Sequence, residues 1–275
     1  MADSVDRLPA WDIQRRSAAY KYVAAEDDTA WNTLESRKAK GRNMYYDLYQ
    51  WKMGQSPDNV RKFCAPDIED DEREDLIEWI RDIEDSGSCQ SLQILFSFSV
   101  PYPVAIDFIV GLEESIVSMG AGCGYWEYLL QKRGVDVISY DKNTEFAPEM
   151  RYTEIKDGEP DKLADHSDKT LMLSWPDADE GSTFSLDCLK YYKGESIIHI
   201  GELFGETMSS NPWGQSTSQA FQMQLGKEFR CINRVQLPNW PGHMDSLTLW
   251  RRVAKPVECD GALFQYVDVP PKRYY

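Results

Sequence analysis

Three glycines at alternate positions follow an apolar run, and a helical pattern begins directly after them. Residues 115–119 have the composition of a buried strand, and Gly120, Gly122 and Gly124 come next. Glycine lets the backbone turn sharply and lets a ligand approach without a Cβ atom in the way. A dinucleotide fingerprint, G-x-G-x-x-G, would need its third glycine at position 125, where this chain has Tyr125. The spacing therefore indicates a ligand loop of another class.

An acid ends the next predicted strand. Residues 135–140 are mostly apolar, and Asp141 follows them, 17 residues after Gly124. At the carboxyl end of a second parallel strand, an acid can accept hydrogen bonds from both ribose hydroxyls of a nucleoside. The glycine loop and this acid together predict a nucleoside site whose loop need not hold a pyrophosphate.

Residues 119–124 resemble the first motif of the class I S-adenosylmethionine-dependent methyltransferases, and Asp141 resembles their ribose-binding acid. Residues 171–177 are similar to their fourth motif, which ends the fourth strand where the methyl group points. The final two predicted strands resemble the reversed pair that closes their sheet. The resemblance covers about residues 95–255 and implies an α/β, Rossmann-like fold. That fold has a seven-stranded, mostly parallel sheet with an antiparallel terminal strand, plus an N-terminal helical cap.

The resemblance also implies a cofactor, S-adenosyl-L-methionine, and a set of residues that would bind it. Methyl transfer is a displacement at an already activated carbon, so alignment and exclusion of water can supply much of the acceleration. The expected cofactor-binding residues are Gly120, Ala121, Gly122, Gly124, Trp126, Asp141 and Ser174.

The methyl acceptor would lie at the ends of the fourth and fifth strands. Trp175 is the expected aromatic wall, and Asp177 would accept a proton, hold an ammonium group or cap the following helix. Glu202 would hold a polar group of the acceptor or act as a base. His199 is either a core residue or a catalytic one, and His243 is either catalytic or a surface residue. Asp177, Trp175 and Glu202 are the predicted catalytic residues.

Two features depart from the family pattern. Many members carry an acid just before the first glycine, whereas residues 117–119 contain none, so the methionine amino group must be held from elsewhere or more weakly. Members that methylate nucleobase amines carry Asp/Asn-Pro-Pro-aromatic in the fourth motif, whereas this chain has Ser174, Trp175, Pro176 and Asp177. The second departure disfavours a nucleobase acceptor.

The strands and helices around these residues must position them. Predicted strands and helices alternate along this part of the chain, and this order predicts parallel βαβ units. A proline- and glycine-rich connection, 238–242, is too short for a crossover helix and predicts antiparallel pairing at the end. The predicted strands are 115–119, 135–140, 153–156, 170–174, 196–200, 229–237 and 246–253, with helices at 125–133 and 183–193.

The region before residue 105 has helical spacing, at 31–53 and at 70–85. We therefore predict two parts, a cap or lid at 1–104 and a cofactor-binding domain at 105–275. By analogy with related enzymes, residues 97–103 would lie across the cofactor and the cap would choose the acceptor. The aromatic residues of the cap would form either an acceptor pocket or the core of a helical subdomain; they are Tyr45, Tyr46, Tyr49, Trp51 and Trp79.

Composition restricts the partners. The chain has 46 acidic and 30 basic residues among 275, a formal net charge of −16, which disfavours nucleic acid. The acidic run at 67–75 is either a solvated helix face or a partner-binding segment. No secretory signal or membrane span is recognisable, so a cytoplasmic location is expected. Six scattered cysteines without metal-ligand spacing predict packed thiols and no metal.

Three functions fit these features. The first is a transferase that methylates a small molecule on nitrogen, oxygen or sulfur. The second is a methyltransferase that acts on a macromolecule, nucleic acid or protein, for which a basic rim would be needed. The third is a scaffold protein that kept the fold and lost the chemistry, which the missing acid before Gly120 favours and the intact loop opposes. A protein partner is compatible with all three.

Overall fold

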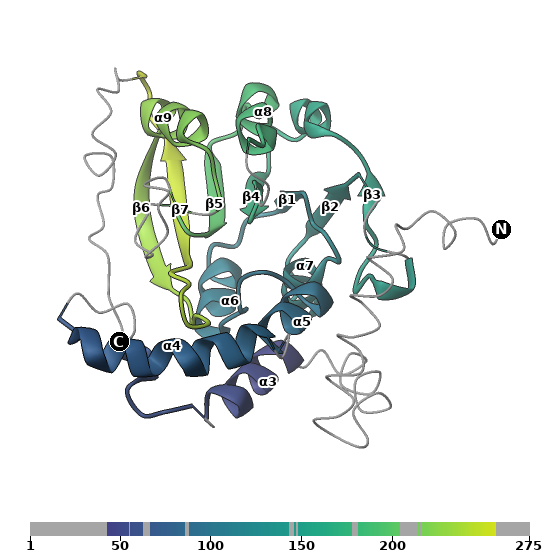
Figure 1. The fold of residues 1–275 in the computed structure, drawn as a ribbon. Helices are drawn as coiled ribbons and strands as arrows, with labels where there is room; N and C mark the ends of the chain where they lie inside the picture. Colours follow the sequence, from purple (N-terminus) through teal and green to yellow (C-terminus); the bar gives the residue numbers. More distant parts are fainter. Residues whose placement is uncertain are drawn as a thin grey trace.

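Seven strands form one mixed sheet with the order β3-β2-β1-β4-β5-β7-β6 (Figure 1). The computed structural model describes residues 43–54, 56–62, 67–85, 88–142, 146, 148–177, 181–203, 214 and 216–256. The strands are β1 (Ile116–Met119), β2 (Val137–Asp141), β3 (Lys156–Asp157), β4 (Thr170–Ser174), β5 (Ser196–Gly201), β6 (Phe229–Gln236) and β7 (Ser246–Arg252).

The first five strands are parallel, and the last two close the sheet in the reversed sense. β1 pairs in parallel with both β2 and β4, so the chain fills one side of β1 before it crosses to the other. β7 runs antiparallel to both β5 and β6 and lies between them. This confirms the predicted Rossmann-like sheet. In such open sheets, ligands bind at the carboxyl edge beside the strand where the order reverses, which here is β1.

Helices cover both faces of the sheet (Figure 1). Those on one face come from the first half of the described chain, and those on the other face come from the second half. The helices are α3 (Met44–Met53), α4 (Asp70–Asp85), α5 (Ser88–Leu95), α6 (Pro103–Val110), α7 (Tyr125–Lys132), α8 (Phe184–Tyr191) and α9 (Gln219–Glu228).

The alternation of side chains along each strand divides the apolar residues into two cores. Ile116 and Met172 belong to the core under α3 to α7, whereas Val117 and Leu171 belong to the core under α8 and α9. All four are completely or almost completely buried. A strand buried on both faces needs a continuous apolar run, which explains why the central strands show no polar alternation.

Three helices, α5, α6 and α9, lie where no helix was predicted. α6 carries a single charged residue, Asp107, and so has no polar stripe to mark its period. This helix also spans residue 104, after which we predicted a boundary between two parts of the chain. The division into two parts stays a prediction. The third strand is Lys156–Asp157, at the end of the predicted 153–156 segment, and both residues are exposed. An exposed edge strand of two residues leaves little hydrophobic pattern to find.

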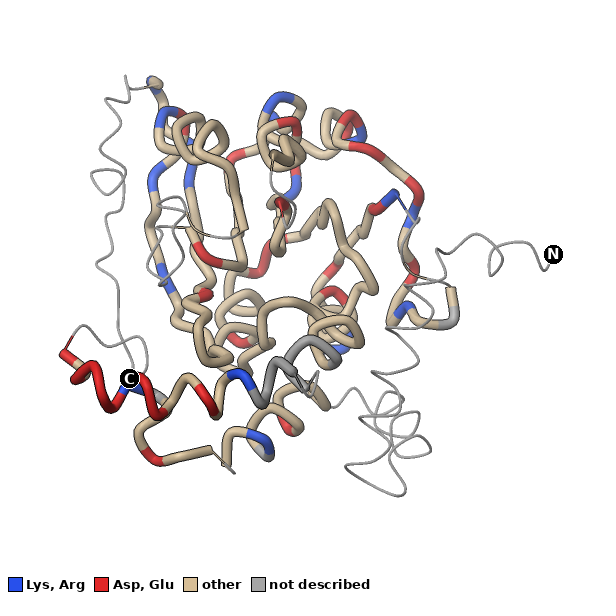
Figure 2. The backbone as a smooth tube through the Cα atoms, in the orientation of Figure 1, with Lys and Arg blue, Asp and Glu red and all other residues tan. Residues whose placement is uncertain are grey.

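The acidic run at 67–75 leads into α4, and acidic positions mark the first turns of this helix along the backbone in Figure 2. Leu76 and Ile80 of α4 are buried, whereas Asp70 and Asp71 are exposed. This arrangement agrees with a solvated amphipathic helix. Within the described chain, no helix is long and apolar enough to cross a membrane.

Candidate functional site

The glycine loop connects β1 to α7 at the carboxyl edge of the sheet. The backbone N–H groups of Gly120 and Ala121 both donate to the Tyr140 carbonyl, at 2.9 and 3.0 Å, which ties the loop to β2. Gly120, Gly122 and Gly124 have φ angles of 77°, 58° and 76°. A residue with a Cβ is strained in this left-handed region, so the loop conformation requires glycine.

Two of these glycines are also needed for packing. A Cβ on Gly120 would lie 3.0 Å from the Phe184 ring, and one on Gly124 would lie 2.9 Å from the Thr153 methyl group. A Cβ on Gly122 would meet only Phe146, at an ordinary 3.5 Å. Gly122 is therefore the glycine whose surroundings leave room, and its partly exposed backbone lies where a ligand could approach.

Asp141 lies directly across from Gly122. Its Oδ2 accepts a hydrogen bond from the Gly122 backbone N–H at 2.8 Å, and its side chain is half-buried. The contact brings together two residues that the sequence predicted for one ligand from separate segments. It places a carboxylate at the end of β2 beside a partly exposed stretch of the loop.

The end of β4 carries an unusual backbone conformation at Trp175, whose φ angle is 48°. Left-handed conformations are rare for residues other than glycine and asparagine, and they persist where surrounding contacts enforce them. The Trp175 indole Nε1 donates to Asp245 Oδ2 at 3.1 Å, and Phe98 stacks on the indole with a centroid distance of 5.0 Å. Phe98 itself is 45% exposed, so the stacked pair faces solvent at the carboxyl edge.

The strand order, the reversed β6–β7 pair and the Gly122–Asp141 contact all match the fold that the sequence resemblance implied. The chain has the class I methyltransferase fold. No protein-family model matches the chain, and no curated protein sequence matches it.

Solved methyltransferase structures resemble this chain distantly. Magnesium protoporphyrin IX methyltransferase from Synechocystis is 11% identical over 65% of this chain and 100% of its own, with a TM-score of 0.38. A SAM-dependent methyltransferase from Aquifex aeolicus is 13% identical over 64% and 98%, with a TM-score of 0.37. The 23S rRNA methyltransferase ErmE is 18% identical over 60% and 74%, with a TM-score of 0.36. Because these TM-scores are low, the assignment of the fold rests on the strand order and the loop geometry.

A buried acid that the sequence reasoning missed lies behind the loop of this methyltransferase fold. Glu127 of α7 is 2% exposed, and its Oε1 accepts a hydrogen bond from Ser118 Oγ at 2.5 Å. Ser118 lies in the segment before Gly120 that lacks the family's acid. Burial raises the pKa of Glu127 to about 7, and the nearby charge of Asp141 acts in the same direction. A carboxyl group is therefore present here, but it comes from the helix.

A second missed acid, Asp245, lies behind Trp175. It is 3% exposed, and its Oδ2 also accepts a hydrogen bond from Ser99 Oγ at 2.7 Å. Its Oδ1 has no hydrogen-bond partner within the described part of the chain. Burial raises the pKa of Asp245, and the charge of His243 opposes that shift. Only the neighbouring Trp175 motif could have directed attention to Asp245, because it lies in a loop of unremarkable sequence.

The two predicted catalytic acids, Asp177 and Glu202, lie near the carboxyl edge of the sheet, but their contacts differ. Asp177 is buried and accepts hydrogen bonds from Ser182 Oγ and from the backbone N–H of Ser185, at 2.7 and 3.1 Å. These contacts favour the capping role at α8 over proton transfer. Glu202 follows β5 and is 1% exposed, and its backbone carbonyl accepts from Ser216 Oγ at 2.5 Å. Ser174 is the last residue of β4 and is half-buried.

Two further candidates lie in the interior. Trp126 is 1% exposed and packs in the core between α7 and the sheet, although its Nε1 has no partner within the described residues. His199 of β5 is fully buried, and burial lowers its pKa to about 3, so the ring is neutral. Its Nε2 lies 3.2 Å from Ser216 Oγ. Both environments favour the structural interpretation over direct contact with ligand.

Across the described ranges, no group of three His, Cys, Asp or Glu side chains is placed to hold an ion. Cys123, Cys188 and Cys231 are buried thiols, which agrees with the packed cysteines that the sequence predicted.

Gly124→Ala should destabilise the fold more than Gly134→Ala. Both glycines have φ angles near 80°, at 76° and 86°, so alanine costs about 1–2 kcal/mol of backbone strain at each. A Cβ at Gly134 meets nothing within 4 Å, whereas one at Gly124 contacts Thr153. We expect Gly124→Ala to lose about 1–3 kcal/mol more in urea unfolding. Equal losses would show that the loop does not need glycine for packing.

Glu127→Gln should remove a pH dependence of stability. The folded-state pKa is raised from 4.5 to about 7, so the folded chain holds a proton that the unfolded chain releases. The free energy of unfolding should therefore fall by roughly 3 kcal/mol as the pH rises from about 5 to about 8. In Glu127→Gln this part of the fall should disappear, while the exposed-acid variant Glu195→Gln should keep it. Superimposable pH curves for wild type and Glu127→Gln would contradict the assignment.

Proposed function

We propose that the chain is an S-adenosylmethionine-dependent methyltransferase whose acceptor is a small molecule. The observation that carries this proposal is the contact between the Gly122 N–H and the Asp141 carboxylate at the strand where the sheet order reverses. It brings an acid that would hold a ribose and an accessible glycine backbone to one side of the carboxyl edge. Those are the two contacts that a nucleoside cofactor without a pyrophosphate requires.

The residues present fit this cofactor on its nucleoside side. Asp141 would hold the ribose, and the glycine loop would receive the chain that links ribose to methionine. Ser174 at the end of β4 would contact the same molecule from the opposite side of β1. Glu127, whose pKa lies near 7, bonds to Ser118 behind the position where the family's acid is absent, and a bound cationic amino group would favour its ionised form. When bound, the cofactor supplies a methyl group that is already activated for displacement.

In this proposal, Trp175 would contact the methyl acceptor. Its indole is held in place by Asp245 and by Phe98, so it forms a rigid apolar wall at the edge of β4. Such a wall excludes water and aligns an acceptor, which are the contributions that displacement needs most. Glu202, buried at the end of β5, would hold a polar group of the acceptor. Asp177 would act through its contacts to α8, by keeping the segment after Trp175 in place.

A small-molecule acceptor accords with charge and with the fourth motif. The net charge of −16 repels a phosphate backbone, and Ser174 replaces the amide or acid that accepts from a nucleobase amine. The same proposal includes a cytoplasmic location and is compatible with a protein partner. The non-catalytic scaffold is the alternative that a failure to bind the cofactor would favour.

Titration calorimetry with S-adenosylmethionine tests the cofactor proposal. Wild type should bind with micromolar affinity, and Asp141→Ala should weaken binding by about tenfold or more, because the ribose loses its acceptor and Gly122 loses its partner. Asp168→Ala is the matched control, since Asp168 is an exposed acid before the amino end of β4. It should bind like wild type. Absence of binding to wild type, or equal binding to Asp141→Ala, would contradict the proposal.

A further inference from the structure

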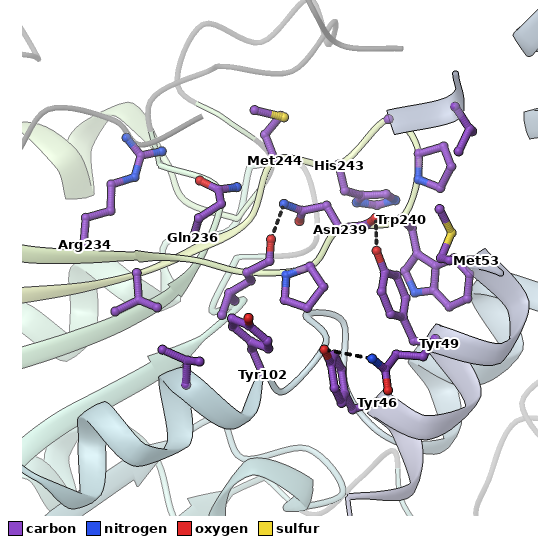
Figure 3. A pocket seen from close by; sticks show the side chains of 18 of the residues that line it. Tyr46, Tyr49, Met53, Tyr102, Arg234, Gln236, Asn239, Trp240, His243 and Met244 are labelled. Carbon is purple, nitrogen blue, oxygen red and sulfur yellow. Dashed lines mark hydrogen bonds between the residues drawn. The ribbon is translucent and has the colours of Figure 1, made fainter. Parts of the chain in front are cut away.

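A cavity of about 790 Å³ lies between α3, the start of α6 and the β6–β7 connection. Its volume is in the range of small-molecule sites. In Figure 3, Tyr46, Tyr49, Tyr102 and Trp240 gather around one part of it. The sequence left two roles open for the aromatic residues of the cap, an acceptor pocket or the core of a helical subdomain, and Tyr45 is buried in the core. Tyr46 and Tyr49 do line this cavity.

The aromatic walls are held by contacts among the lining residues and with Tyr45. Tyr46 lies against Tyr102 with ring centroids 5.6 Å apart, and Tyr49 meets Trp240 edge-on at 5.1 Å. The Tyr49 hydroxyl donates to the Asn239 carbonyl at 2.9 Å, and Trp240 Nε1 donates to the Tyr45 hydroxyl at 2.9 Å. These hydrogen bonds join α3 to the β6–β7 connection. A preformed aromatic enclosure of this kind favours a flat aromatic ligand.

The charge of the lining is opposite to that of the chain. The sequence contains 46 acidic residues, yet none of the described residues that line the cavity is Asp or Glu. Its ionisable side chains other than tyrosine are Arg234 and His243. A cationic ligand would find no carboxylate in the wall. The lining therefore suits an uncharged or anionic molecule.

His243 connects the cavity to the proposed site of methyl transfer. It lines the cavity, and its ring centroid lies 6.2 Å from that of Trp175 at the end of β4. Its Nδ1 is buried without a hydrogen-bond partner among the described residues, as is Asp245 Oδ1 two residues along the chain. The charges of the two side chains interact. A histidine that lines a cavity beside the proposed site of methyl transfer is placed to accept a proton from a bound acceptor.

We propose that this cavity binds the methyl acceptor, that the acceptor is a small aromatic alcohol of the phenol class, and that His243 takes the proton from its hydroxyl group. This proposal rests on the proposed function for its chemical step. The hydroxyl oxygen forms a bond to the methyl carbon of S-adenosylmethionine, and the carbon–sulfur bond breaks with its electron pair on sulfur. The proton passes to the imidazole of His243. The products are a methyl ether, S-adenosylhomocysteine and a protonated histidine near Asp245.

Calorimetric titration with 2-naphthol tests the cavity independently of catalysis. The titration is done in the presence and in the absence of S-adenosylhomocysteine. Wild type should bind 2-naphthol, and 2-naphthylmethylamine, its cationic counterpart, should bind at least about tenfold more weakly. Tyr102→Ala should weaken 2-naphthol binding by about fivefold or more, because a stacking face is lost. Tyr191→Ala, which removes an exposed tyrosine of α8, should leave it unchanged. No binding to wild type, preference for the amine, or indifference to Tyr102→Ala would overturn the cavity assignment.

The role of His243 is tested by transfer of a labelled methyl group from S-adenosylmethionine to 2-naphthol. His243→Gln should lower the rate by about a hundredfold while 2-naphthol binding changes by less than about threefold. An unchanged rate, or a loss of rate that only follows lost binding, would overturn the role of His243. If wild type binds both molecules and transfers no methyl group, the phenol chemistry is wrong. If 2-naphthol binds and S-adenosylmethionine does not, the proposed function fails while the cavity assignment stands.

Discussion

The hydrogen bond from the Gly122 N–H to the Asp141 carboxylate is the contact on which the arrangement of this site depends. It can form only because β1 and β2 are parallel neighbours in the register that opposes Met119 to Tyr140. It also needs the left-handed turn that the loop glycines provide. The sheet order then places β4 on the other side of β1, so Trp175 ends beside the same edge. One backbone contact thus links topology, loop chemistry and the proposed ligand.

Glu127 and Asp245 are among the carboxyl groups that are buried in this acidic chain. Glu127 and Asp245 each accept a hydrogen bond from a serine hydroxyl, and burial raises the pKa of each carboxyl group. Burying an ionisable group without a matching cation lowers stability, so acids of this kind concentrate at functional sites. Glu127 lies behind the loop of the proposed cofactor, and Asp245 lies behind Trp175 and close to His243.

The sheet was predictable because its central strands are continuous apolar runs separated by glycine loops and amphipathic helices. The meeting of Gly122 and Asp141 was predictable for a related reason, since both residues lie just at the ends of neighbouring parallel strands. The helix α6 was missed because its residues are apolar on nearly every side. Asp245 and Glu127 were missed because their meaning depends on contacts with Ser99 and Ser118. Those contacts arise only when distant segments pack together, and residue spacing along the chain does not record them.

The most direct test of this account is a backbone amide NMR titration of the labelled chain with S-adenosylhomocysteine. The account predicts that the largest chemical-shift changes fall on Gly120, Gly122 and Asp141, with smaller changes at the end of β4. Amides of α9, on the opposite face of the sheet from α7, should stay unchanged. Saturating ligand that leaves the glycine-loop amides unmoved, or that shifts a different surface, would contradict the central claim that this edge is a methyltransferase cofactor site.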